Sequence, residues 1–400
     1  MIIKLGLDTI ERAMTTVTSI TSDRSLKEDL KNLVIWVKGG KTYFVAINGN
    51  ISSVTLVEAL VDREGSTEEE IFVQLRAKDI NDIVASMKGL KRTKVASVEL
   101  HISENEAIMH VFEEPIDPEM AFADKYFQVS KHRVTKTRIK DIVKEEINKI
   151  NMDVEGEPVT SVDLKLYIDA LLPTVAKETR EATSNVMFGD DYLYTRLTSY
   201  AAVMKSELPD VCKGFRLTNN YVAFLRNFAS DETIYINKVE VGNGLVILTL
   251  KNKDSVAQIK CPDLSRAYDL TPCLGIPDNG VVVDKPYLID VLKRVNKGNE
   301  PVFIEISVHE GVGTFKVVSK LMTQEIPVTK AKGEGDYSFS IRADLLSSVI
   351  MSHVNMFDET LYMYFEYDDK NIVMACTDCL GLWHTKMMGL TSGKGNFDWK

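Results

Sequence analysis

The side chains that could do chemistry are few and scattered in this sequence. Its five cysteines lie at positions 212, 261, 273, 376 and 379, and only Cys376 and Cys379 have the C-x-x-C spacing of a metal or redox site. That pair belongs to an expected strand, where two thiols need not converge, and no second pair accompanies it. We therefore expect reduced thiols, with neither a metal site nor redox chemistry.

The six histidines offer no catalytic centre either. His101, His110 and His384 lie in strand-like runs, where a hydrogen-bonded structural imidazole is the expected role, and none has a partner at ligand spacing. The glycines of VGNGL and GEGD match neither common phosphate-binding pattern. The paired carboxylates Asp190-Asp191 and Asp368-Asp369 lie at expected hairpin tips, which turn chemistry explains. We expect no catalytic residue, no cofactor and no enzymatic activity.

What remains is electrostatic, and a repeated element positions it. From Tyr337 to His353 the apolar residues change from every second position to helical spacing, which predicts a strand that continues into an amphipathic helix. The same change occurs at 2–20, 71–90, 162–175, 215–228 and 281–295. Six strand–helix units are therefore expected, each followed by further strands. This pattern predicts an α+β chain dominated by antiparallel sheet, and not alternating βαβ units.

Individual residues predict where these elements begin and end. Asp8 is the expected cap of the first helix, and Asp284 that of the fifth, with Pro286 in its first turn. Pro173 should kink the third helix or end it early. Gly39-Gly40 indicates a tight hairpin between two strands.

The units pair into three expected domains of two similar halves each. Their bounds are 1–130, 161–264 and 279–390, with a connecting segment at 131–160, a linker at 265–278 and a tail at 391–400. The connecting segment predicts a short amphipathic helix in a solvated linker. A DNA-facing role for Lys136, Arg138 and Lys140 is the alternative.

The charge balance limits what the protein could bind. A net charge of −10 argues against nucleic acid if charge is spread evenly. However, many acids lie in expected loops, whereas bases lie on the helices and their ends, so a basic helical layer inside an acidic shell would permit DNA binding. The alternative is that these cations only complement helix dipoles. The candidate DNA-facing residues are Arg12, Arg24, Arg76, Lys78, Lys88, Lys91, Arg92, Lys177, Arg180, Arg226, Lys293, Arg294, Lys297 and Arg342.

The order of elements resembles the bacterial-type DNA polymerase sliding clamp, the β subunit family, over essentially the whole chain. The strongest local match is IRADLLSSVIMSH, LYMYFEYDD, NIVMACTD and LWHTKMMGL, which stand where the family has its last helix, last hairpin and C-terminal peptide-binding strand. LYTRLTSYAAV stands where the family has A-T-D-G-H-R-L. Thr198 is kept there, and Tyr200, Ala201 and Ala202 replace the glycine, histidine and arginine, as in a divergent viral or phage member.

The resemblance implies three tandem clamp domains, each with two helices on an inner face and antiparallel sheets outside, forming a half ring. It implies a cytoplasmic homodimer that encircles double-stranded DNA without reading its sequence, with a DNA polymerase and a clamp loader as partners. By position, the partner-peptide pocket would comprise Thr183, Thr198, Tyr200, Val203, Pro272, Leu274, Met387, Met388 and Leu390.

Three points stay open from the sequence. Phe397 and Trp399 in the tail are a candidate anchor for a partner or for the chain's own pocket, and a disordered tail is the alternative. A clamp-like factor for transcription or repair would share the fold and differ in its partner. A structural repeat protein would use the same six units without binding DNA.

Overall fold

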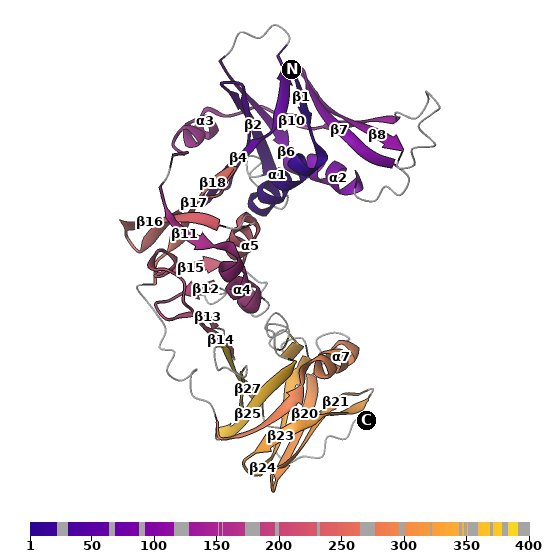
Figure 1. Ribbon diagram of the computed structural model, residues 1–400, viewed down its shortest axis with the longest axis vertical. Helices are drawn as coiled ribbons and strands as arrows, with labels where there is room; N and C mark the ends of the chain where they lie inside the picture. Colours follow the sequence, from indigo (N-terminus) through magenta and orange to yellow (C-terminus); the bar gives the residue numbers. More distant parts are fainter. Residues whose placement is uncertain are drawn as a thin grey trace. The chain divides into compact units, whose positions relative to one another are not determined.

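A computed structural model describes most of the chain (Figure 1). The described residues are 1–21, 31–63, 69–87, 93–115, 128–150, 152–153, 155–172, 185–196, 200–229, 233–264, 277–295, 301–320, 322–343, 346–347, 350, 359–368, 371–377 and 383–390. They form two compact units. One comprises Met1–Ser161 with Ala223–Cys261, and the other comprises Val162–Val222 with Pro262–Lys400. The division into three domains remains a prediction.

The expected strand–helix units are present in the described residues, except that the strand of the third unit, expected within 162–175, lies before that range, at 157–160. In chain order, the first five units are β1 (Ile2–Leu5) with α1 (Leu7–Ile20), β6 (Glu70–Arg76) with α2 (Ala77–Met87), β11 (Glu157–Thr160) with α4 (Ser161–Leu171), β15 (Phe215–Thr218) with α5 (Asn219–Phe228), and β19 (Asn279–Asp284) with α7 (Lys285–Val295). The sixth begins with β24 (Gly335–Arg342), which is followed by helical residues at 343, 346–347 and 350.

The predicted element boundaries are mostly confirmed. Asp284 caps α7, because its Oδ1 accepts a hydrogen bond from the backbone N–H of Tyr287 at 2.7 Å. Gly39 and Gly40 have φ of 54° and 76°, as a two-residue hairpin requires. The prediction for Asp8 is wrong: α1 begins at Leu7 after Gly6, so Asp8 lies inside the first turn, where its charge complements the helix dipole. α4 ends at Leu171, before Pro173, as predicted.

The first unit contains two antiparallel sheets. The five-stranded sheet has the order β5 (Ala59–Asp62), β1, β7 (Thr93–Ile102), β8 (Ala107–Pro115) and β9 (Gln128–Val134). The nine-stranded sheet has the order β10 (Lys136–Thr137), β6, β2 (Asn32–Lys38), β3 (Lys41–Ile47), β4 (Ile51–Val57), β18 (Ser255–Pro262), β17 (Leu245–Lys251), β16 (Thr233–Gly242) and β11.

Two features of these sheets were not expected from the sequence. Residues 51–62 form two strands, β4 and β5, which belong to different sheets and separate at Glu58. β4 pairs with β18 in antiparallel register, so that Thr55 lies opposite Ser255, a residue 200 positions away in the chain. This pairing makes residues 223–261 part of the first unit.

The connecting segment is packed, which corrects the expected solvated linker. Its helix α3 (Asp141–Asn148) places Ile147 and then Ile150 in a cluster with Val34, Trp36 and Val256 on the nine-stranded sheet. Figure 1 shows α3 and α1 on opposite sides of this sheet, and α1 contacts β3 and β4.

Apolar residues at 143 and 147 of α3, with 139 before the helix and 150 after it, form one apolar stripe, which is why this segment packs on the sheet. The side chain of Lys136 is also part of the fold. Its ammonium group donates to the carbonyl oxygens of Ser103 and Glu104 at 2.7 and 2.9 Å. Lys136, one of the three cations considered as alternative DNA contacts, is therefore already engaged in hydrogen bonds within the protein.

The second unit is built on a sheet of thirteen strands. The main path is β15, β12 (Asn185–Phe188), β13 (Tyr192–Arg196), β14 (Tyr200–Lys205), β27 (Trp383–Leu390), β24, β20 (Pro301–His309), β21 (Val312–Val318) and β22 (Thr323–Ile326), and β19, β23 (Val328–Lys332), β25 (Thr360–Asp368) and β26 (Asn371–Thr377) pair beside it.

The second unit has its core around α7. Leu288 and Leu292 of this helix pack with Phe315, Phe339 and Phe365 of the strands. A single 3-10 turn, Asp210–Cys212, precedes β15. Antiparallel pairing dominates the sheets of the described residues, as the sequence predicted. No helix among these residues is both long and apolar enough to cross a membrane.

Candidate nucleic-acid interface

The candidate DNA contacts on the first two helices lie at the surface and have acidic neighbours. On α1, the side chain of Arg12 is 71% exposed, with Nη1 4.0 Å from Asp254 Oδ2. On α2, Lys78 forms an ion pair with Asp82 one turn further along. Both cations are therefore partly neutralised before any nucleic acid arrives.

The cations of α5 and α7 lie in the last turn of each helix. Arg226 is exposed on α5, and Lys293 and Arg294 are exposed on α7. Lys293 Nζ is 3.8 Å from Asp290 Oδ1, and Arg294 Nε donates to the carbonyl oxygen of Asp290 at 3.2 Å. Their positions fit the dipole interpretation of these residues as well as the DNA interpretation.

Acids balance bases on the helices of the repeated units. Across α1, α2, α4, α5 and α7 the two kinds of charged residue are equal in number. Asp8, Asp79 and Asp163 each lie in the first turn of a helix, where they complement the positive end of the dipole. A basic layer would therefore depend on the segments at the helix ends. Most of those candidates lie outside the described residues: Arg24, Lys88, Lys91, Arg92, Lys177, Arg180 and Lys297.

Two further arginines differ from the exposed helix cations. Arg76 is half-buried at the end of β6, and its Nε is buried without a hydrogen-bond partner among the described residues. Arg76 directly precedes α2, and its backbone N–H donates to the carbonyl of Thr135 at 2.9 Å. The backbone of Arg342 ends β24, and its side chain lies outside the described part.

The structure brings part of the predicted partner pocket together at the junction of β14 and β27. Tyr200 and Met387 are register partners in adjacent strands, and Met388 and Leu390 continue β27. Val203 is 1% exposed and packs with Met187 and Tyr194. The side chains of Tyr200, Met387, Met388 and Leu390 are not described, and Thr183, Thr198, Pro272, Leu274 and the tail with Phe397 and Trp399 lie outside the described residues.

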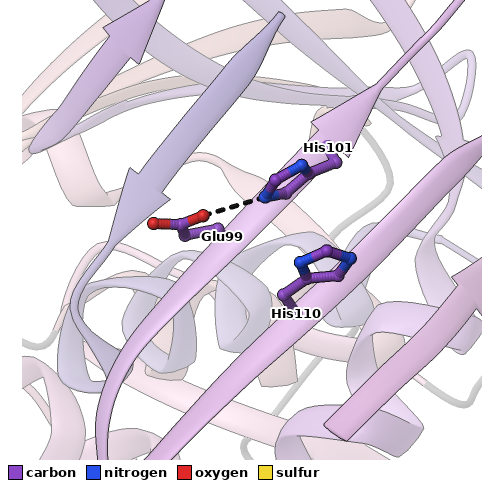
Figure 2. Close-up of side chains that lie close together, drawn as sticks. All are labelled: Glu99, His101 and His110. Atoms are coloured by element: carbon purple, nitrogen blue, oxygen red, sulfur yellow. Dashed lines mark hydrogen bonds and ion pairs between the residues drawn. The ribbon is translucent and has the colours of Figure 1, made fainter. Parts of the chain in front are cut away.

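One cluster was missed by the sequence interpretation. Glu99, His101 and His110 lie together on the five-stranded sheet (Figure 2), with the rings of His101 and His110 stacked at a centroid distance of 4.0 Å. His101 Nε2 is 2.8 Å from Glu99 Oε2, and Lys4 Nζ is 2.7 Å from Glu99 Oε1. The prediction that no histidine has a partner at ligand spacing is wrong for this pair.

The electrostatics of this cluster follow from its contacts. The hydrogen bond from Lys4 lowers the pKa of the Glu99 carboxyl, and the hydrogen bond to His101 acts in the same direction. Burial lowers the pKa of His110, and the neighbouring His101 adds to that effect. The sequence feature that could have revealed this cluster is the turn of the β7–β8 hairpin. In this turn the N–H of Ser103 donates to the carbonyl of Glu106 at 2.9 Å. A register fixed by that turn sets His110 opposite Glu99.

The cysteines follow the expectation of free thiols as far as they are described. Cys212, Cys261 and Cys376 are buried and not in disulfides. Burial raises the pKa of the Cys261 thiol to about 12, which keeps it protonated and unreactive. Cys273 and Cys379 lie outside the described residues, so the C-x-x-C pair is not tested.

Comparison with known proteins identifies the fold. No protein-family model matches the sequence, and no curated protein matches it. Among solved structures, the DNA polymerase III beta subunit of Thermotoga maritima superposes with a TM-score of 0.71 at 15% identity, over 98% of this chain and 100% of that one. The same subunit from Borrelia burgdorferi gives 0.70 at 14% identity, and the DNA polymerase sliding clamp of Caulobacter crescentus gives 0.68 at 14%, with the same coverage. The chain therefore has the fold of the sliding clamps.

Proposed function

We propose that this protein is a DNA sliding clamp, a processivity factor that holds a DNA polymerase on its template and catalyses no reaction itself. The observation that carries the proposal is the likeness to bacterial polymerase III beta subunits over 98% of this chain and the whole of theirs. A partial likeness would fit any antiparallel α+β domain, whereas a match over the whole length includes all six strand–helix units. The low identity supports a divergent member of that group, such as a phage protein.

In the proposed assembly each chain is a half ring of three domains, and two chains close head to tail around duplex DNA. Helices α1, α2, α4, α5 and α7 would face the DNA. Cations that meet phosphates without reading base edges leave the free energy nearly constant as the ring moves along the duplex. Processivity would then come from topology, because release requires opening the ring.

The charge balance of the helices suits this role. Ion pairs such as Lys78–Asp82 and Lys293–Asp290 reduce the attraction between the helix surface and phosphate. A ring that must slide benefits from weak contacts, since a strong contact would hold it in one place. We propose that the stronger contacts come from the helix ends that carry Lys88, Lys91, Arg92, Lys177, Arg180 and Lys297, together with Arg24.

We further propose that a polymerase and a clamp loader bind through short peptides at the junction of β14 and β27. The register pair Tyr200–Met387 supports this location, because it brings two of the residues expected in the pocket onto adjacent strands. The strand β27 ends at Leu390, directly before the tail that carries Phe397 and Trp399.

The test is loading on circular DNA. The protein is loaded onto a nicked circle with a loader extract, the free protein is removed by gel filtration, and half of the sample is linearised with a single-cutting restriction enzyme. A topological ring stays on the closed circle and slides off the linear ends. Equal retention on both forms would contradict the proposal. Light scattering of the free protein tests the dimer, and pull-down of a DNA polymerase or of RNA polymerase distinguishes replication from transcription as its role.

A further inference from the structure

The cluster of Glu99, His101 and His110 lies on one face of the β7–β8 hairpin. Glu99 and His101 are two residues apart in β7, and the residues that alternate with them, Val98 and Leu100, are buried beneath the sheet. His110 is the register partner of Glu99 in β8. The hairpin backbone therefore holds the three side chains together on the face that points away from the core (Figure 2). Glu99 and His101 come from one strand, and His110 lies directly across the ladder from Glu99.

The distances between the three side chains suit a single metal ion. One ligand atom from each residue lies within 4.8 Å of the other two, and His101 Nε2 is 2.8 Å from Glu99 Oε2. Metal–ligand bonds of 2.0–2.2 Å at a tetrahedral angle require ligand atoms roughly 3.3–3.6 Å apart. Because the two imidazoles are stacked, at least one ring must turn about its side-chain bonds so that a nitrogen lone pair, which lies in the ring plane, points at the ion.

We propose that Glu99, His101 and His110 form a binding site for a divalent transition-metal ion, with Zn²⁺ as the best match. Two imidazoles and one carboxylate are borderline ligands of the type that zinc prefers, and this set is unsuited to Mg²⁺ or Ca²⁺, which take oxygen ligands. Three protein ligands leave one position open for water or for a donor from another molecule.

Lys4 acts as a positioning residue in this proposal. Its Nζ is 2.7 Å from Glu99 Oε1, whereas His101 contacts the other carboxylate oxygen, Oε2. Glu99 would therefore keep its bond to Lys4 and use Oε2 as the metal ligand. A partner that orients a ligating carboxylate in this way is a regular feature of metal sites. Lys131, the register partner of His110, adds a positive charge nearby and lowers the expected affinity.

His309 also lies among carboxylates, and it shows that the residue types alone do not make a metal site. His309 Nδ1 is 3.2 Å from Glu334 Oε2, and its Nε2 is 3.0 Å from Asp336 Oδ1. The two carboxylates thus contact opposite nitrogens of one ring. A single ion could not be reached by the imidazole and by both carboxylates, so this cluster is a hydrogen-bonded network and provides a matched control.

The test uses the full chain after removal of bound metal with a chelator. Zn²⁺ binding is measured by equilibrium dialysis with elemental analysis, in the wild type and in E99Q, H110N and H309N. We expect one Zn²⁺ per chain for the wild type and for H309N, and at least tenfold weaker binding for E99Q and H110N. Far-UV circular dichroism of each metal-free variant confirms that it is folded.

Cobalt gives an independent readout that does not depend on stability. Co²⁺ bound by two imidazoles and a carboxylate in a four-coordinate site absorbs visible light strongly, and this band should be present in the wild type and H309N and absent in H110N. Zinc binding that is unchanged in E99Q and H110N would assign the ion to other residues and overturn the proposal. A wild type that binds no Zn²⁺ at millimolar concentration would overturn it as well.

Discussion

Asn48 and Asn252 make the same set of hydrogen bonds in two different strand–helix units. Asn48 Nδ2 donates to the carbonyl of Ile20, the last residue of α1, and its Oδ1 accepts from the N–H of Ile51 at 3.0 Å. Asn252 Nδ2 donates to the carbonyl of Phe228, the last residue of α5, and its Oδ1 accepts from the N–H of Ser255 at 2.7 Å. Each asparagine joins a helix end to the turn that leads into β4 or β18, and these two strands pair with each other.

We expect N48A and N252A each to lower the free energy of unfolding by about 1–3 kcal/mol, because each leaves a helix carbonyl and a turn N–H without a partner. N48D should lose at least as much, since it keeps the acceptor for the N–H of Ile51 but places a negative charge beside the carbonyl of Ile20, at the negative end of α1. Urea unfolding measures these differences. The control N50A changes an exposed side chain in the same turn and should have no effect; an equal loss in N50A would show that the turn tolerates no change.

The β4–β18 junction contains a buried hydroxyl pair, Ser255 Oγ donating to Thr55 Oγ1 at 2.9 Å. T55V alone should destabilise by about 1–3 kcal/mol, because Ser255 is then buried without its acceptor. The double variant T55V/S255A removes both polar groups and should recover most of that loss. A double-mutant cycle in urea measures the coupling, and purely additive losses would contradict the pairing.

Helix α3 should contribute to the stability of the first unit. Ile147 is 1% exposed in the cluster with Val34 and Val256, so I147A should lower the free energy of unfolding by about 2–5 kcal/mol through lost burial and a cavity. E145A, on the exposed side of the same helix, is the matched control and should be near neutral. Calorimetry compares the two variants. A solvated linker would instead give the same small effect for both.

The network at His309 predicts a local pH dependence. The pKa of His309 is raised by its hydrogen bonds, first to Asp336 and then to Glu334. The charged imidazolium is therefore favoured in the folded state. Its contribution to stability is complete below the unfolded pKa of about 6.5 and is lost as the pH rises through the higher folded value. An NMR titration of His309 should show a lower pKa in D336N than in the wild type. An identical pKa in both proteins would contradict the network.

Charge reversals should separate the contribution of the segments that follow the helices from that of the last helical turns. We expect K91E/R92E to reduce DNA loading more than K293E/R294E does, because Asp290 already partly neutralises the latter pair. Each lost phosphate contact should also reduce the salt slope of binding by about 0.9. K41E/K330E, with the same charge change at exposed strand positions, is the control. Equal losses in all three double variants would indicate only a general effect of net charge.

The sequence predicted local features well, and long-range ones poorly. The change from period two to helical spacing is contained within about twenty residues, so the strand–helix units and the Asp284 cap could be recognised. The β4–β18 pairing depends on residues 200 positions apart, and no local pattern encodes it. The packing of α3 was missed for the same reason, since Val256 is part of its binding surface.

The candidate site also combines features that the local sequence predicts with features that depend on distant residues. The basic residues of the helices, and acids one turn away such as Asp82 beside Lys78, could be named from the sequence, but Asp254 beside Arg12 comes from another element. The cluster of Glu99, His101 and His110 was missed because a strand period places Glu99 and His101 on one face, whereas His110 joins them only through the register of the hairpin.

The pairing of β4 with β18 also affects how the protein is made. The ribosome produces β4 early, but its partner strand ends only at Pro262. At about 5–20 residues per second, the edge of β4 would remain without its neighbour for about 10–40 s. During that interval an unpaired strand edge is exposed to other nascent chains, which is a known route to aggregation. Expression yield should therefore depend on the speed of translation between these two strands and on chaperones that cover the edge of β4.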